Sequence, residues 1–209
     1  MTILVVTGTD TGIGKTVFAA GLAGALGAHY WKPIQAGVDP EGDKETVAAL
    51  SGLSPDRILP EAYRLNTPAS PHLAARIDGV EIDLDRLTLP QVDGPLVIEG
   101  AGGVLVPVTE TLLMADLFAH WGQPVILCAR TGLGTINHSL LSIEALRARG
   151  VPIAGIAFIG DPHAENERII PRIAGISSLG RLPHLDPLDP AGLARAFAAH
   201  IALSDPFNR

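Results

Sequence analysis

The chain has 209 residues and a formal net charge of −7 at pH 7. This length suits one domain with a full hydrophobic core, so we expect a single domain over residues 1–209 and no second large one. The negative charge argues against nucleic acid and anionic membranes as partners, because both attract positively charged surfaces. No segment reaches the ~20 uninterrupted apolar residues that cross a bilayer.

The core is expected to consist of aliphatic side chains. Hydrophobic residues make up 47% of the chain and aromatic residues only 4%, a balance typical of a parallel sheet covered by helices. The single cysteine, Cys128, lies in the apolar run PVILCA and has no partner for an intramolecular disulfide. A buried thiol in a cytoplasmic protein is therefore predicted.

Apolar runs alternate with helical patterns along the chain, which predicts an α/β fold with a mostly parallel central sheet flanked by helices on both faces. Strands are predicted at 2–7, 30–34, 95–99, 124–129, 152–159 and, more weakly, 175–182. Helices are predicted at 15–26, 44–51, 112–121, 135–149 and 190–202, with helix ends near Gly27, Gly52, Gly122 and Gly150. The stretch 53–94 is rich in proline, and we expect no regular strand in it.

The first predicted strand leads into GTDTGIGKT, residues 8–16, and then into the first predicted helix. This order places backbone N–H groups and a helix N-terminus around a phosphate, as in P-loop NTPases. Lys15 is expected to reach the terminal phosphoryl oxygens, and the Thr16 hydroxyl to hold Mg²⁺. The spacing is a variant, since five residues rather than four separate Gly8 from Gly14. The expected nucleotide contacts in this segment are Gly12, Ile13, Gly14, Lys15, Thr16 and Val17.

Charged residues lie at the carboxyl ends of the next two predicted strands. Lys32, in YWKPIQAG, stands at the carboxyl end of a strand, where open α/β sheets bind ligands, although a surface lysine is the alternative. Glu99 ends PLVIE before three glycines in four residues, which fits a Mg²⁺ contact or an exposed glutamate. A second metal carboxylate is left open between Asp43 and Glu45, and Asp43 equally suits a helix N-cap.

A later segment, TGLGTINHSLL at 131–141, repeats the order of strand, glycine loop and helix start. Its free N–H groups would suit a carboxylate, and a plain connection between strand and helix is an equal alternative. The seven histidines show no close spacing of the kind that binds metals.

Five motifs, GTDTGIGKT, WKPIQAG, PASPH, EGAGG and GLGTINH, occur in this order over residues 8–138. Together they resemble the dethiobiotin synthetase family, and the resemblance continues weakly through GRLPHL near residue 180. It implies a homodimeric, Mg²⁺- and ATP-dependent ligase that closes a cyclic urea from 7,8-diaminononanoate and CO₂ in biotin synthesis.

The resemblance also implies residue roles. Lys15 and Lys32 would flank the carbamate and the γ-phosphate, with Thr11 beside the carbamate. Mg²⁺ would lie among Thr16, Asp43 and Glu99. The neighbouring subunit would hold the substrate's remote carboxylate with its glycine loop at 134–137. The remaining expected contacts are Ala36, Gly102, Gly134, Thr135, Ile136 and Asn137 for the substrate, and Gly160 and Pro183 for the nucleotide.

Two positions depart from the pattern of some family members. Ala36 stands where some have a serine or threonine, which removes a hydroxyl near the substrate. Ile159, before Gly160, stands where some have an asparagine that reads adenine. Because a lost hydrogen-bonding pair lowers discrimination more than affinity, we expect a weaker choice among nucleotide bases.

Two other functions are alternatives. A partitioning-type ATPase carries an extra lysine five positions before the P-loop lysine, where this chain has Asp10. A carboxylate there cannot neutralise phosphoryl charge, so this class is only a runner-up. The catalytic half of an amidotransferase-linked ligase would need a glutaminase domain or partner.

Overall fold

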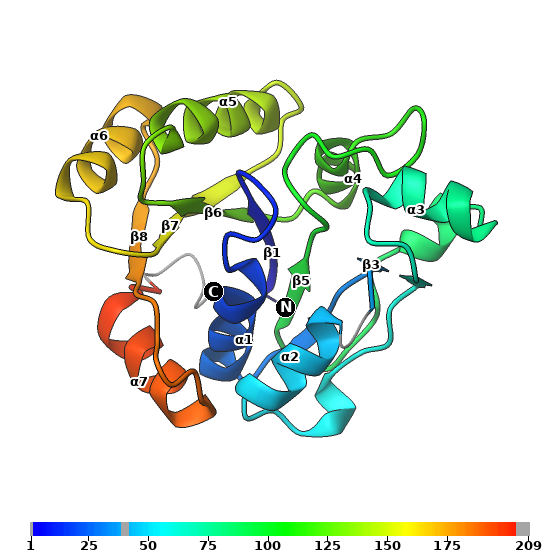
Figure 1. Cartoon of the computed structure of the whole chain (residues 1–209), viewed down its shortest axis with the longest axis horizontal. Helices are drawn as coiled ribbons and strands as arrows, with labels where there is room; N and C mark the ends of the chain where they lie inside the picture. Colours follow the sequence, from blue (N-terminus) through cyan, green and yellow to red (C-terminus); the bar gives the residue numbers. More distant parts are fainter. Residues whose placement is uncertain (1, 39–41, 204–209) are drawn as a thin grey trace.

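The computed structural model describes residues 2–38 and 42–203, and its centre is a parallel sheet (Figure 1). The sheet has six strands in the order β2-β5-β1-β6-β7-β8, and every adjacent pair is parallel. Their bounds are β1 Ile3–Gly8, β2 His29–Trp31, β5 Leu96–Glu99, β6 Val125–Arg130, β7 Ile153–Ile159 and β8 Ser178–Leu182. The predicted α/β architecture is confirmed. Ligands in such sheets bind beyond the carboxyl ends of the strands.

Helices cover both faces of this sheet (Figure 1). One face carries α1 Lys15–Leu26, α2 Asp43–Leu50 and α7 Pro190–His200, and the other carries α4 Met114–Trp121, α5 Thr135–Arg147 and α6 Ala164–Ala174. Gly27 and Gly122 end α1 and α4 in the left-handed conformation, as the sequence predicted. Helix α6 was not predicted, although Ile169, Ile170 and Ile173 recur at helical spacing; Pro171 lies inside it, and proline is unfavourable in a helix interior.

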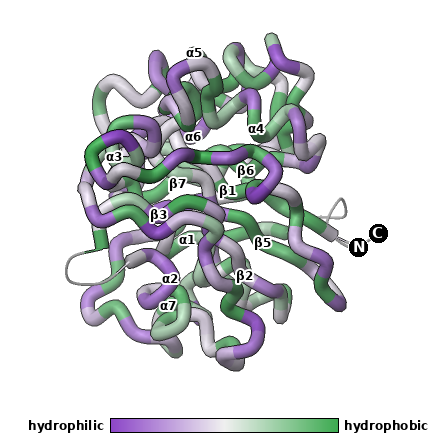
Figure 2. The backbone as a smooth tube through the Cα atoms, turned by 90° about the vertical axis from the view of Figure 1, so that its right-hand side faces the viewer, coloured by the Kyte–Doolittle hydropathy of each residue, from purple (hydrophilic) through white to green (hydrophobic). Residues whose placement is uncertain are grey.

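Two hydrophobic cores lie on opposite faces of the sheet, because successive strand residues point in opposite directions. In β1, Leu4 and Val6 pack into the core beneath α1, α2 and α7, while Val5 packs into the core beneath α4, α5 and α6. Cys128 is buried in the first of these cores, as predicted, and burial raises the pKa of its thiol. Figure 2 shows hydrophobic residues concentrated along the central strands.

A small parallel sheet, β3 Ile34–Ala36 with β4 Tyr63–Leu65, lies beside helix α3, Pro71–Asp78. Two 3₁₀ helices, Pro55–Arg57 and Leu84–Leu87, complete this region. The expectation that 53–94 holds no regular strand was therefore wrong. The predicted strand 30–34 was also wrong in extent, because β2 stops at Trp31 and β3 starts at Ile34, with Pro33, which has no N–H to donate, in the break.

Within the described residues, none of the helices is both long and apolar enough to cross a membrane.

Candidate active site

The loop between β1 and α1 has the backbone that its glycines predict. Gly12 and Gly14 have φ angles of 68° and 95°, a region that glycine adopts without steric cost. Lys15 is the first residue of α1, and its ammonium folds back to donate to the Asp10 carbonyl oxygen at 2.8 Å. The loop therefore presents a helix N-terminus and an ammonium at the carboxyl end of the central strand, an arrangement suited to phosphate.

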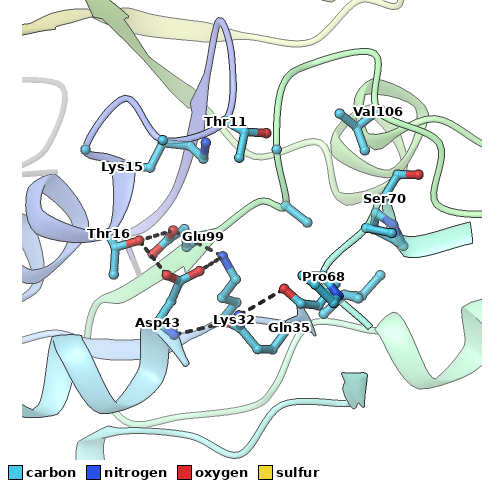
Figure 3. A pocket seen from close by; sticks show the side chains of 18 residues that line it. Thr11, Lys15, Thr16, Lys32, Gln35, Asp43, Pro68, Ser70, Glu99 and Val106 are labelled. Atoms are coloured by element: carbon cyan, nitrogen blue, oxygen red, sulfur yellow. Dashed lines mark hydrogen bonds and ion pairs between the residues drawn. The ribbon is translucent and has the colours of Figure 1, made fainter. Parts of the chain in front are cut away.

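Three oxygen atoms from different elements meet beside this loop (Figure 3). The Thr16 hydroxyl oxygen lies 2.9 Å from Asp43 Oδ1 and 2.9 Å from Glu99 Oε1. A hydroxyl has one hydrogen, so it donates to only one of the two carboxylates at a time. Hydroxyl and carboxylate oxygens are the hard donors that Mg²⁺ prefers, and this set of three fits that ion.

Lys32 lies immediately beyond β2 and points into the same cluster (Figure 3). Its ammonium forms an ion pair with Asp43 and lies 3.2 Å from Glu99 Oε1. Burial alone lowers the pKa of Lys32, but the carboxylates of Glu99 and Asp43 outweigh burial and raise that pKa above its ordinary value. The alternative of a surface lysine is wrong, because only 4% of Lys32 is exposed.

The charged groups around Lys32 have shifted pKa values as well. Burial alone raises the pKa of Asp43, but the ion pair with Lys32 and the hydrogen bond from Thr16 bring that pKa below its ordinary value. Burial, followed by repulsion from Lys32, lowers the pKa of Lys15, with Glu99 acting in the opposite direction. Two ammonium groups thus converge on one site from the P-loop and from the end of β2.

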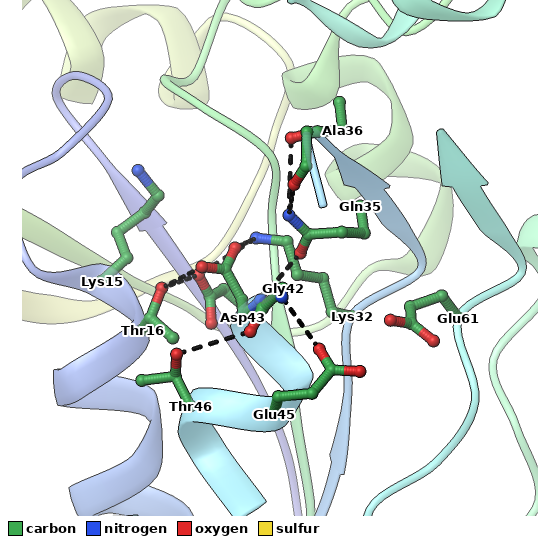
Figure 4. Close-up of polar contacts among 12 residues, drawn as sticks. Lys15, Thr16, Lys32, Gln35, Ala36, Gly42, Asp43, Glu45, Thr46 and Glu61 are labelled. Atoms are coloured by element: carbon green, nitrogen blue, oxygen red, sulfur yellow. Dashed lines mark hydrogen bonds and ion pairs between the residues drawn. The ribbon is translucent and has the colours of Figure 1, made fainter. Parts of the chain in front are cut away.

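The N-terminus of α2 places Asp43 and Glu45 in different surroundings (Figure 4). Asp43 is the first residue of the helix and faces Thr16, whereas Gly42 is the N-cap. Glu45 Oε2 accepts a hydrogen bond from the Gly42 N–H at 3.0 Å, and its Oε1 accepts one from Arg64 at 2.9 Å. Glu45 is thus a capping residue, and Asp43 supplies the oxygen of the cluster.

Two cavities lie on either side of the P-loop and share Gly12 and Gly14. The first has a volume of about 580 Å³ and contains the cluster. Of the residues predicted for chemistry, metal or substrate, it is lined by Thr11, Lys15, Thr16, Lys32, Ala36, Asp43, Glu99 and Gly102. The second has a volume of about 550 Å³. Of the residues predicted for the nucleotide, it is lined by Gly12, Ile13, Gly14, Val17, Gly160 and Pro183.

The predicted carboxylate loop at 134–137 lines neither of these two cavities. Gly134 is the N-cap of α5, and the buried Thr135 hydroxyl donates to the Arg130 carbonyl oxygen at 2.6 Å. Ile136 and Asn137 are exposed. A single chain therefore does not bring this loop to the two lysines.

Two residues of the site escaped the sequence analysis. The Tyr30 hydroxyl donates to Glu99 Oε2 at 2.8 Å, and burial together with Glu99 raises the pKa of Tyr30 well above its ordinary value. Gln35 Oε1 accepts a hydrogen bond from the Asp43 N–H at 3.1 Å, and its amide nitrogen donates to the Gly37 carbonyl oxygen at 2.9 Å. A polar Gln35 inside the apolar motif WKPIQAG was the signal available for the second, and Tyr30 carried none.

The sequence of this chain is similar to those of known proteins. A family model described as an AAA domain matches residues 2–192. The ATP-dependent dethiobiotin synthetase of Agrobacterium fabrum is 64% identical over 201 residues, covering 96% of this chain and 95% of its own. That of Rhodopseudomonas palustris strain BisB18 is 66% identical over 194 residues, covering 93% of each chain. The chain belongs to the ATP-dependent dethiobiotin synthetase family.

Membership of the dethiobiotin synthetase family confirms the resemblance that the five motifs indicated. A solved structure of the MinC:MinD cell division protein complex from Aquifex aeolicus aligns with a TM-score of 0.56, covering 94% of this chain and 86% of that chain. Its sequence is 14% identical, so this likeness shows the P-loop fold alone and lends no weight to the ATPase alternative.

Proposed function

We propose that the chain carboxylates 7,8-diaminononanoate with CO₂ and closes the ring to dethiobiotin, at the expense of ATP, in biotin synthesis. The observation that carries this proposal is the convergence of Lys15 and Lys32 on one cavity beside the P-loop, in a chain 64% identical to a dethiobiotin synthetase. The buried, unpaired Cys128 suits a reducing cytoplasm.

The reaction needs positioned charges rather than a protein nucleophile. One substrate amine adds CO₂ and loses a proton to form a carbamate. A carbamate oxygen attacks the γ-phosphorus of ATP, ADP leaves, and a carbamic-phosphoric anhydride forms. The second amine attacks the anhydride carbon, and phosphate and a proton leave as the ring closes. Lys15 and Lys32 neutralise negative charge on the carbamate and the transferring phosphoryl group, with Thr11 beside them.

Thr16, Asp43 and Glu99 would hold Mg²⁺, because their three oxygens converge at hydrogen-bonding distance with a single hydroxyl hydrogen among them. When bound, the ion neutralises charge on the phosphoryl oxygens. Glu99 and Asp43 also hold Lys32, so the same carboxylates orient the ammonium toward the cavity.

The second cavity is the proposed site of the nucleotide base and ribose. Ile159, an aliphatic residue, lines it next to Gly160, and no side-chain amide stands at that position to read a base. Discrimination among bases should therefore be weak. Phosphate release measured with ATP, CTP and GTP tests this, and exclusive use of ATP would refute it.

We further propose a homodimer in which residues 134–137 of one protomer hold the substrate's remote carboxylate in the other. In the single chain these residues line neither of the two main cavities, although the N-terminus of α5, which begins at Thr135, suits an anion. Leu105, Leu133 and Leu141 are exposed near this loop and would be covered by association. Dilution below the dimer dissociation constant should raise KM for diaminononanoate.

The test of the whole proposal is dethiobiotin formation, followed by mass spectrometry alongside phosphate release. Both products should require diaminononanoate, bicarbonate and a nucleoside triphosphate together. Phosphate release without diaminononanoate would instead favour an ATPase switch, and dependence on glutamine would favour the amidotransferase-linked ligase.

A further inference from the structure

The structure assigns a role to Tyr30, which the five motifs leave out. We propose that Tyr30 is a positioning residue that orients the Glu99 carboxylate toward the Thr16 and Lys32 side of the site and thereby sets the affinity for the divalent cation. This inference rests on the proposed function, in which Glu99 is one of the cation's ligands.

The sheet brings Tyr30 and Glu99 together from neighbouring strands. β2 pairs with β5 in a register that places Tyr30 opposite Val97 and Trp31 opposite Ile98. Tyr30 is completely buried in the core under α1 and α2, whereas Trp31 points to the opposite core. The tyrosine ring thus lies on the same face of the sheet as the helices that carry Thr16 and Asp43.

The two carboxylate oxygens of Glu99 have separate partners. Oε2 accepts the Tyr30 hydroxyl at 2.8 Å, while Oε1 lies 2.9 Å from the Thr16 hydroxyl and 3.2 Å from the Lys32 ammonium. With one oxygen held from behind, the other is directed into the cavity. This is how hydrogen-bonded partners behind metal ligands usually act.

Without the Tyr30 hydroxyl, Glu99 Oε2 would be buried and unpaired. Only 1% of Glu99 is exposed, so water cannot replace the lost donor. The carboxylate would then turn to share its remaining partners, Thr16 and Lys32, through both oxygens. The cation would meet a ligand that has lost its fixed orientation.

The experiment compares Tyr30→Phe with a matched control, Tyr63→Phe. Tyr63 is also buried and also loses a hydroxyl contact, because its oxygen accepts from the Asp83 N–H at 2.8 Å, but it lies in the small sheet. Mn²⁺ binding to the ADP-saturated full chain is measured by electron paramagnetic resonance. Tyr30→Phe should weaken binding about 10- to 100-fold, and Tyr63→Phe less than about 2-fold. Equal binding by Tyr30→Phe and wild type would overturn the proposal.

A double-mutant cycle separates positioning from general stability. Because Tyr30 acts through Glu99, Tyr30→Phe should add no further loss of Mn²⁺ affinity in a Glu99→Ala background. An additive loss would mean that Tyr30 supports the fold alone, and it would overturn the proposal. Both single variants are expected to lower the melting temperature, so melting alone does not distinguish the two roles.

If Tyr30→Phe fails to fold, fluorine NMR of protein that retains Tyr30 tests the proposal instead. The chain has two tyrosines, so Tyr63→Phe protein labelled with 3-fluorotyrosine reports on Tyr30 alone. Adding Mg²⁺ to the ADP-saturated protein should shift this resonance, and an unchanged resonance would contradict the role. None of these measurements needs diaminononanoate. Failure of wild type to form dethiobiotin would therefore refute the proposed function. The Mn²⁺ measurements would still test whether Tyr30 sets the cation affinity.

Discussion

Replacing Lys32 with methionine removes one of the two ammonium groups of the site while nearly preserving side-chain volume. Lys32 lies 3.2 Å from Glu99 Oε1 and forms an ion pair with Asp43. At an effective dielectric constant of about 20, Coulomb's law gives about 5 kcal/mol for unit charges at 3.2 Å. Desolvation of both charges opposes this attraction, and breaking a buried pair costs about 3–5 kcal/mol. Because the Asp43 side chain is 32% exposed, water can partly solvate its unpaired carboxylate in the variant. We therefore expect the free energy of unfolding to fall by about 3 kcal/mol, the lower end of this range.

Lys32→Met should lower kcat strongly while leaving the Mg²⁺ concentration that the enzyme requires nearly unchanged or lower. Losing a charge that acts on the transition state lowers kcat by about 10²- to 10³-fold. Without the Lys32 ammonium between them, Asp43 and Glu99 should bind Mg²⁺ at least as tightly as in wild type. Steady-state dethiobiotin formation at varied Mg²⁺ measures both quantities, and urea unfolding measures the stability.

Lys44→Met is the matched control, because Lys44 is in α2 beside Asp43 but pairs with Glu61 outside the active-site cavity, at 2.8 Å. In Lys44→Met, Glu61 still forms its ion pair with Arg64 at 2.8 Å, so its carboxylate does not lose its last positive partner. We therefore expect kcat to change by less than about 2-fold. A Lys32→Met enzyme with the kcat of wild type would refute the charge-neutralisation argument, as would one whose only defect was weak Mg²⁺ binding.

Three more outcomes are expected. Lys15→Ala should lower kcat by at least about 10²-fold with the fold intact by circular dichroism, since its ammonium acts on the phosphoryl group. Gln35→Leu removes the acceptor of the Asp43 N–H and should cost about 1–2 kcal/mol in urea unfolding while raising the Mg²⁺ requirement; an unchanged requirement would contradict its role. The lowered pKa of Asp43 contributes stability that is present above the ordinary aspartate pKa of 3.8 and lost as pH falls through the folded-state value, so melting temperature should drop at acid pH, and less so in Lys32→Met. An equal drop in both proteins would argue against the ion pair.

Local sequence was sufficient wherever one continuous segment builds the feature. The strand, glycine loop and helix around Lys15 are adjacent in the chain, so their order predicted the phosphate site. Lys32 and Glu99 were found for a similar reason, since each directly follows or ends a short apolar strand of a parallel sheet. The sequence analysis missed β4 and α3, which are short, and α6, which has Pro171 in its interior although its isoleucines recur at helical spacing.

Contacts between distant segments needed the folded chain. Asp43 and Glu45 are two residues apart, and helix geometry turns such residues to different sides. Only the position of α2 against Thr16 showed that Asp43 faces the oxygen cluster and that Glu45 caps the helix. Tyr30 looked like any aromatic residue in an apolar strand until the register of β2 on β5 placed its hydroxyl against Glu99. Sequence patterns record which way a side chain points along its own element, whereas the partner it meets depends on how elements far apart in the chain pack together.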